Sequence, residues 1–104
     1  MAPAVEHESD FAAKASLFGA KIRSRRAELG LSERSLAELA GVSRSYVTLL
    51  LKDRGSHKGV DGTYKPPNPT LDIIWRLADA LEVDPTYLVD HRRQVEHDLP
   101  RGGE

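Results

Sequence analysis

Two serines that can each begin a helix lie only eleven residues apart, at Ser32 and Ser43, with Gly41 between them. Serine is a preferred N-cap because its side-chain oxygen accepts a hydrogen bond from a backbone N–H of the first helical turn. A glycine ends the preceding helix because it adopts the left-handed conformation at no steric cost. The segment "SERSLAELAGVSRSYVTLL" therefore predicts two short helices joined by a tight turn, which is the spacing of a helix-turn-helix unit.

Apolar periodicity predicts three further helices around this unit. Residues 16–29 place Phe18, Ile22 and Leu29 on one stripe, and Gly30 follows as a C-terminal stop. After the unit, Thr70 caps a helix whose predicted buried stripe is Leu71, Ile74, Leu77, Ala78 and Leu81; Asp84 and Pro85 then start a short fifth helix. The Gly- and Pro-rich residues 53–69 between helices three and four can form neither a helix interior nor a central strand. The predicted fold is all-α, with five helices and a long loop between the third and the fourth.

The two ends of the chain differ in character from this middle part. Residues 1–15 are polar and acidic and predict an N-terminal arm or an initial helical turn. Residues 91–104 carry charges of both signs and end in Pro and Gly, which favours a solvated polar tail. One domain is expected over residues 16–90, since 104 residues support a single small core.

Charge is unevenly distributed although the net charge is only -1. Formal charges sum to +5 over residues 16–69 and to -4 over residues 70–90. A basic face opposite an acidic one is therefore possible, and the basic part includes the helix-turn-helix unit. The absence of cysteine, of a membrane-length apolar run and of a signal-peptide pattern favours a cytoplasmic protein with no membrane association.

No residue pattern in the chain suggests catalysis or metal binding. The four histidines have no i, i+3 or i, i+4 pairing on a helix, and there is no cysteine to complete a zinc site. The chain also lacks a Gly-rich phosphate loop after a strand and a nucleophile elbow. We expect no catalytic residues, no metal site, no cofactor and no enzymatic activity.

The segments "LGLSERSLAELAGVSRSYV" and "NPTLDIIWRLADALEVDPTYLV" resemble the phage-repressor-like helix-turn-helix family of bacterial and phage transcription regulators, also called the XRE or Cro type. The resemblance covers residues 18–90. It implies that the third helix, at residues 44–52, lies in the major groove of DNA while the second braces it across the backbone. It also implies a homodimer on a two-fold symmetric operator, with a repressor as the expected kind of regulator.

Three consecutive leucines in the third helix raise the question of which side chains face DNA. At about 100° per residue, Leu50 and Leu51 fall near the inward-facing Val47. Leu49 falls on the outward side and could contact a thymine methyl group. The predicted base contacts are Arg44, Ser45, Thr48 and Leu49, with Arg44 directed toward guanine O6 and N7. Alternatively, Leu49 packs under the long loop and Arg44 contacts only phosphate.

Predicted phosphate contacts come from the edge of the same helix and from the loop that follows it. A cation there would add salt-dependent affinity without sequence information. The alternatives are a solvated loop, in which the charges of Arg54, Lys58 and Lys65 only maintain solubility, and a Tyr46 that covers the edge of the core. The full predicted phosphate set is Arg26, Ser43, Tyr46, Lys52, Arg54 and Lys58.

Two positions depart from the family pattern. Many members have Gln at the start of the second helix, where this chain has Glu33; a carboxylate there is expected to turn away from phosphate or to complete the helix N-terminus. Many members also pair an arginine of the first helix with an acidic residue late in the third, where this chain has Leu51. Arg26 would then be free for a phosphate or for another carboxylate such as Glu38.

The fourth and fifth helices carry apolar side chains beside their predicted inward stripe. Large apolar groups left facing water indicate a contact surface. The predicted homodimer contacts are Ile73, Trp75, Tyr87 and Val89, and the alternative is that the arm or the loop covers Trp75. A rival function keeps the same fold but binds a protein, as an antitoxin or a regulator's partner would, with Leu49 and Trp75 as anchors.

Overall fold

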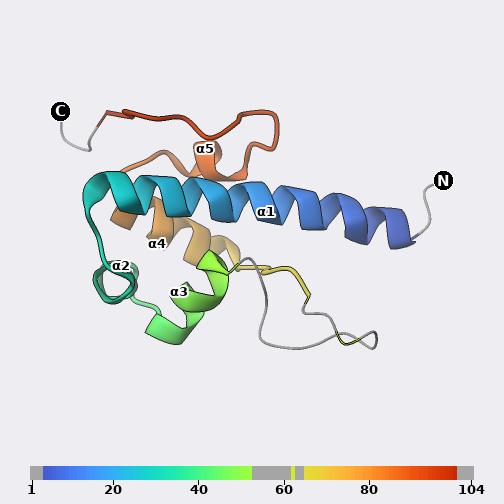
Figure 1. Ribbon diagram of the computed structural model, residues 1–104, viewed down its shortest axis with the longest axis horizontal. Coiled ribbons are helices and arrows are strands. Elements are labelled where there is room, and N and C mark those ends of the chain that lie inside the picture. The colour runs from blue at the N-terminus through green and yellow to red at the C-terminus, as the bar shows by residue number, and fades with distance from the viewer. Residues whose placement is uncertain (1–3, 53–61, 63–64, 101–104) are drawn as a thin grey trace.

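The computed structural model describes residues 4–52, 62 and 65–100, and for residues 4–9 it describes the backbone alone. Within these ranges the chain forms five helices and no strand: α1 (Ala4–Leu29), α2 (Glu33–Ala40), α3 (Arg44–Leu51), α4 (Leu71–Leu81) and α5 (Pro85–Val89). The predicted all-α, five-helix fold is confirmed. In Figure 1, α1 crosses the whole molecule, with α2 and α3 on one side of it and α5 with the C-terminal segment on the other.

The predicted helix boundaries of the helix-turn-helix unit are confirmed by the backbone. Ser32 Oγ accepts a hydrogen bond from Ser35 N at 3.0 Å, and Ser43 Oγ accepts one from Tyr46 N at 3.0 Å. Gly41 lies in the left-handed region at φ 69°, and its N–H bonds the last carbonyls of α2. The predicted caps of the later helices, Thr70 and Asp84, also accept a hydrogen bond from their helix's first turn.

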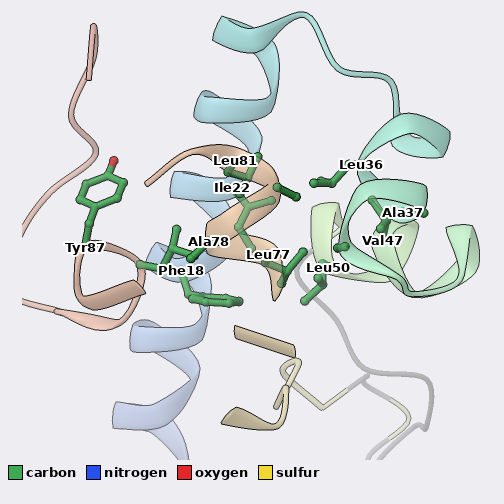
Figure 2. Packing of buried hydrophobic residues seen from close by; sticks show 13 residues of the cluster. Phe18, Ile22, Leu36, Ala37, Val47, Leu50, Leu77, Ala78, Leu81 and Tyr87 are labelled. Carbon is green, nitrogen blue, oxygen red and sulfur yellow. The ribbon is translucent and has the colours of Figure 1, made fainter. Parts of the chain in front are cut away.

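The core lies where α1, α2, α3 and α4 meet. Ile22, Leu36, Val47, Leu77 and Leu81 are each 0% exposed, and they come from four different helices. Figure 2 shows these side chains converging between α1, α4 and the helix-turn-helix unit. The unit is therefore held rigidly against the rest of the domain, since it shares one closely packed interior with it.

α1 is much longer than the sequence predicts, because it begins at Ala4 and includes 26 residues. The predicted arm over residues 1–15 is thus mainly the first part of this helix. Its apolar pattern is weak, but the segment is rich in alanine, which has the highest intrinsic helix propensity. An ion pair one turn apart, Lys14 Nζ to Asp10 Oδ2 at 3.1 Å, adds to the helix surface.

α1 also carries two buried cations that the sequence did not reveal, Lys21 at 0% and Arg25 at 3% exposure. Lys21 Nζ donates to the carbonyls of Tyr87 at 2.6 Å and Asp90 at 2.9 Å, at the C-terminal end of α5. Burial lowers the pKa of Lys21 below its ordinary value. The positive charge is stabilised there because carbonyls at a helix C-terminus present negative partial charge.

The C-terminal segment is not the solvated tail that the sequence predicts over residues 91–104, since its described part, up to Pro100, is bonded to α1 and α5. Arg25 Nη1 donates to Leu99 O and Arg25 Nη2 to Pro100 O, each at 3.1 Å. Asp98 N donates to Glu28 Oε2 at 2.8 Å. These bonds run mostly to backbone atoms, and such contacts leave no periodic pattern in the sequence. We call residues 91–100 the C-terminal clasp.

Acid is expected to weaken the clasp. The pKa of Glu28 is lowered chiefly by the hydrogen bond from Asp98 N, and the pKa of Glu96 is lowered chiefly by the side chain of Arg93. A carboxyl group with a lowered folded pKa stabilises the fold above its unfolded pKa, and that contribution is lost as the pH falls through the folded pKa. The free energy of unfolding in urea should therefore drop as the pH falls below about 4.5.

The glutamine variant Glu28→Gln provides the matched control for this acid effect. It removes one of the titrating groups, so its stability should be lower at neutral pH and should fall less steeply in acid. Equal pH dependence in the variant and the parent would show that Glu28 does not contribute.

Candidate nucleic-acid interface

The outward face of α3 carries all four side chains predicted to contact bases. Arg44 and Ser45 are exposed, Thr48 and Leu49 are half-buried, and together they line one shallow hollow of about 460 Å³. The part of the chain that the structure describes gives the Arg44 guanidinium no hydrogen-bond or ion-pair partner, so its donors remain available. We call this surface the α3 outer face.

The inward side of α3 accounts for the other two leucines. Leu50 is 1% exposed and Leu51 is half-buried against the core, as predicted. Leu49 instead takes its place in the hollow beside Thr48. The run of three leucines thus divides between the core and the α3 outer face.

The turn before α3 is supported from α4. Arg76 Nη1 donates to the carbonyl of Gly41 at 3.3 Å, and Arg76 Nη2 pairs with Asp72 at 3.0 Å. α2 also packs against both α3 and α4. The start of α3 is therefore fixed relative to the rest of the domain by contacts on two sides.

α1 is linked to α3 by Arg23, a contact that the sequence did not predict. Arg23 Nη1 donates to the carbonyl of Leu51 at 3.1 Å, where a cation stabilises the C-terminal end of the helix. Where many family members have an acidic side chain at this position, the backbone carbonyl of Leu51 is thus the acceptor. Arg26 Nη1 donates to Leu31 O at 2.8 Å, in the turn after α1, and it is not paired with the suggested Glu38; its contact with a DNA phosphate stays a prediction.

Glu33 is in the first turn of α2, as one of the two alternatives predicted, and its carboxylate also lies beside the α3 outer face. Its Oε1 accepts a hydrogen bond from Thr48 Oγ1 across the helix-turn-helix unit. No ion pair joins Glu33 to a basic side chain within the described ranges. The residue spacing gave no signal for this contact, because Glu33 and Thr48 are fifteen positions apart and on different helices.

Three of the predicted phosphate contacts lie around the α3 outer face. Ser43 and Lys52, at the two ends of α3, are exposed. Tyr46 is half-buried, and burial raises its pKa above the ordinary 10.0, so its hydroxyl keeps its proton and can donate. The remaining loop candidates, Arg54 and Lys58, lie outside the described residues, as do His57 and Tyr64.

The predicted dimer contacts divide into exposed and buried residues. Trp75 is 49% exposed and Val89 is 51% exposed, whereas Ile73 is half-buried against the core. Tyr87 is wrong as a dimer contact, because it is 2% exposed and its hydroxyl accepts a hydrogen bond from Glu96 N at 2.9 Å within the clasp. Leu71, predicted to be buried, is 67% exposed at the first turn of α4, one turn from Trp75.

Other kinds of site find little support in the part of the chain that is described. No three His, Asp or Glu side chains there are grouped so that they could hold a metal ion. No helix there has the length and apolar character that crossing a membrane requires.

Comparison with known proteins agrees with this geometry. The family model described as "Helix-turn-helix" matches residues 22–56, which span the end of α1, α2, the turn and α3. The restriction-modification controller protein C.AhdI from Aeromonas hydrophila is 33% identical to the chain, over 73% of this chain and 97% of its own, with a TM-score of 0.57. No curated protein matches the chain.

The fold and the exposed α3 face define a helix-turn-helix DNA-binding domain. The chain belongs to the phage-repressor-like, XRE-type family of helix-turn-helix transcription regulators, as the resemblance implies.

Proposed function

We propose that this protein is a sequence-specific regulator of transcription, acting as a repressor, that inserts α3 into the major groove of double-stranded DNA. The main support for the proposal is that the four candidate base contacts of the α3 outer face line one hollow, which faces away from the core. The similarity to a restriction-modification controller protein supports a regulatory role. A regulator of this kind acts in the cytoplasm, on the nucleoid, and needs neither catalysis nor a cofactor.

Three of the four side chains of the hollow, Arg44, Ser45 and Leu49, each suit a particular group on a base edge. Arg44, in the first turn of α3, donates in a bidentate manner to guanine O6 and N7. Ser45 bonds a neighbouring base edge, and Leu49 packs against a thymine methyl group. Because α3 is capped, follows a turn that Arg76 of α4 bonds, and is buried on its inner side, these groups are positioned before DNA arrives.

Phosphate contacts then fix the register of α3 in the groove. Lys52 supplies a charge at one end of the helix, and the hydroxyls of Ser43 and Tyr46 donate to phosphates at the other. Arg26 also remains in this set, since the bond to Leu31 O uses only one of its guanidinium donors. Arg54 and Lys58 remain candidates by sequence.

Selection of bound duplexes from a random pool tests this proposal. Enrichment of one sequence, arranged as two half-sites about 34 Å apart, supports a dimeric DNA-binding regulator. Binding of the selected duplex should weaken steeply with salt, by roughly 10³-fold or more between about 50 and 200 mM if six or more phosphates are contacted. Absence of enrichment would contradict the proposal and favour a protein-binding role for the same fold.

Homodimerisation is proposed through the exposed apolar side chains of α4 and α5, chiefly Leu71, Trp75 and Val89. A monomeric protein seldom exposes several large apolar side chains on neighbouring helices. Trp75 is the expected anchor, because tryptophan is enriched among the residues that dominate interface energies. A protein partner on this surface is the alternative.

Replacing Trp75 with serine is expected to weaken the dimer. Loss of an aromatic anchor should raise the dimer dissociation constant on the order of 30-fold, measured by sedimentation equilibrium. Leu39→Ser is the matched control, since Leu39 is 62% exposed but lies on α2, outside the proposed interface of α4 and α5. If both variants self-associate like the parent, or if the parent is monomeric, this interface is wrong.

A further inference from the structure

The hydroxyl of Thr48 lies between two groups that can only accept hydrogen bonds. One is the Oε1 of Glu33, and the other is the backbone carbonyl of Arg44 at 3.0 Å. A hydroxyl has one hydrogen to donate, and an ionised carboxylate and a carbonyl have none. The hydrogen of Thr48 is therefore directed into the protein, and the oxygen keeps only lone pairs for the hollow that Thr48 lines.

Glu33 adds a second acceptor at the same place. Its carboxylate is half-buried beside Thr48, and among the described residues no cation is paired with it. A carboxylate close to a DNA surface is repelled by phosphates, and the Thr48 hydroxyl occupies only one of its acceptor sites, so a donor on DNA would stabilise it. The donors that DNA offers in the major groove are the amino groups of cytosine N4 and adenine N6.

Cytosine fits this acceptor pair better than adenine does. Beside its N6 amino group, adenine presents the N7 acceptor in the major groove, which would repel a carboxylate. Cytosine presents its N4 amino group with no acceptor of its own beside it. In the major groove, guanine presents two acceptors, and thymine presents one acceptor and a methyl group. Neither base has a donor there for Glu33 or Thr48, so both are disfavoured.

We propose that Glu33 and Thr48 act together as a specificity determinant that selects cytosine in each half-site. Glu33 both accepts from the cytosine amino group and positions the Thr48 hydroxyl so that it accepts as well. The interface thereby has a donor part, at Arg44, and an acceptor part, formed by Thr48 of the α3 outer face and Glu33 of α2. This inference rests on the proposed function and concerns which base the interface prefers.

Random-pool selection with matched variants tests the inference. The parent protein should enrich a C·G pair in each half-site besides the pair whose guanine Arg44 contacts. Glu33→Gln should move that preference to adenine, because an amide can donate to N7 and accept from N6. Thr48→Val, which removes the hydroxyl at nearly constant shape, should reduce the preference for cytosine about fivefold or more. Glu38→Gln is the control, since Glu38 is exposed about 140° around the same helix.

The possible outcomes separate this inference from the proposed function. Absence of this second C·G pair from the selected site, or an unchanged base preference in both Glu33→Gln and Thr48→Val, overturns the role of the pair but leaves the regulator intact. A change in Glu38→Gln equal to that in Glu33→Gln would show a charge effect only and would also overturn it. Failure of the parent to enrich any sequence overturns both.

Discussion

Replacing Arg44 with alanine is expected to weaken binding to the selected duplex about 10- to 100-fold and to abolish the preference for guanine at one position. Arg44 is exposed at the start of α3, and no described residue engages its guanidinium. Alanine retains the helix, since it has the highest helix propensity. The loss would therefore come from missing contacts with DNA, measured by fluorescence anisotropy on matched and mismatched duplexes.

Two controls separate base recognition from charge. Arg44→Lys keeps the positive charge but loses the bidentate geometry, so it should bind more weakly yet with a similar salt dependence. Arg34→Ala removes an exposed cation from α2 and should leave the base preference unchanged. If Arg44→Ala discriminates against mismatches as well as the parent, then Arg44 contacts only phosphate, which is the alternative left open by the sequence.

Replacing Arg25 with methionine is expected to destabilise the fold by about 3 kcal/mol, from the lost charged hydrogen bonds and the carbonyls left without a partner. Arg25 is 3% exposed, and its guanidinium joins the end of α4 to the clasp. Nε donates to Leu81 O at 2.8 Å, and the terminal nitrogens reach the carbonyls of Glu82, Leu99 and Pro100. Methionine fills a similar volume but donates nothing, so urea denaturation should show the difference.

Hydrogen exchange gives a second measurement on the same variant. The amides of Glu96 and Asp98, bonded to the Tyr87 hydroxyl and to Glu28, should exchange faster once the clasp loosens. Arg34→Met is the control, since its exposed side chain should change stability by no more than about 0.5 kcal/mol. Unchanged stability and exchange in Arg25→Met would show that the clasp does not depend on this arginine.

Much of the fold could be predicted from the sequence because its helix signals are local. The serine caps, Gly41 and the apolar spacing each act within a few residues, and the structure confirms them. The side of α3 that carries Arg44, Ser45, Thr48 and Leu49 follows from the same periodicity, once Val47 is taken as buried.

The parts that could not be predicted depend on contacts between distant residues. Arg25 and Lys21 are buried because carbonyls from the end of α5 and from the clasp surround them, and backbone acceptors are the same in every sequence. Glu82 ends α4 in the left-handed conformation, at φ 57°, where a glycine would have been the usual signal. Tyr87 was assigned to the surface because the clasp that covers it contains few apolar residues, so its sequence gave no sign of packing against Tyr87.

The contact of Glu33 with Thr48 in the candidate site also could not be predicted from the sequence. From the sequence, a carboxylate at the start of α2 suggests only a favourable interaction with the helix N-terminus. Its contact with Thr48 depends on the crossing of α2 and α3, which brings residues fifteen positions apart together. Specificity arising from such a pair can be found only once both helices are placed.

Chemical footprinting with dimethyl sulfate tests most directly whether α3 enters the major groove. The reagent methylates guanine N7 in the major groove and adenine N3 in the minor groove, two positions that lie on opposite sides of the base pair. On the selected duplex, the protein should protect a guanine N7 in each half-site, and Arg44→Ala should remove that protection. Full reactivity of every guanine N7 under saturating protein, or protection confined to adenine N3, would contradict the account.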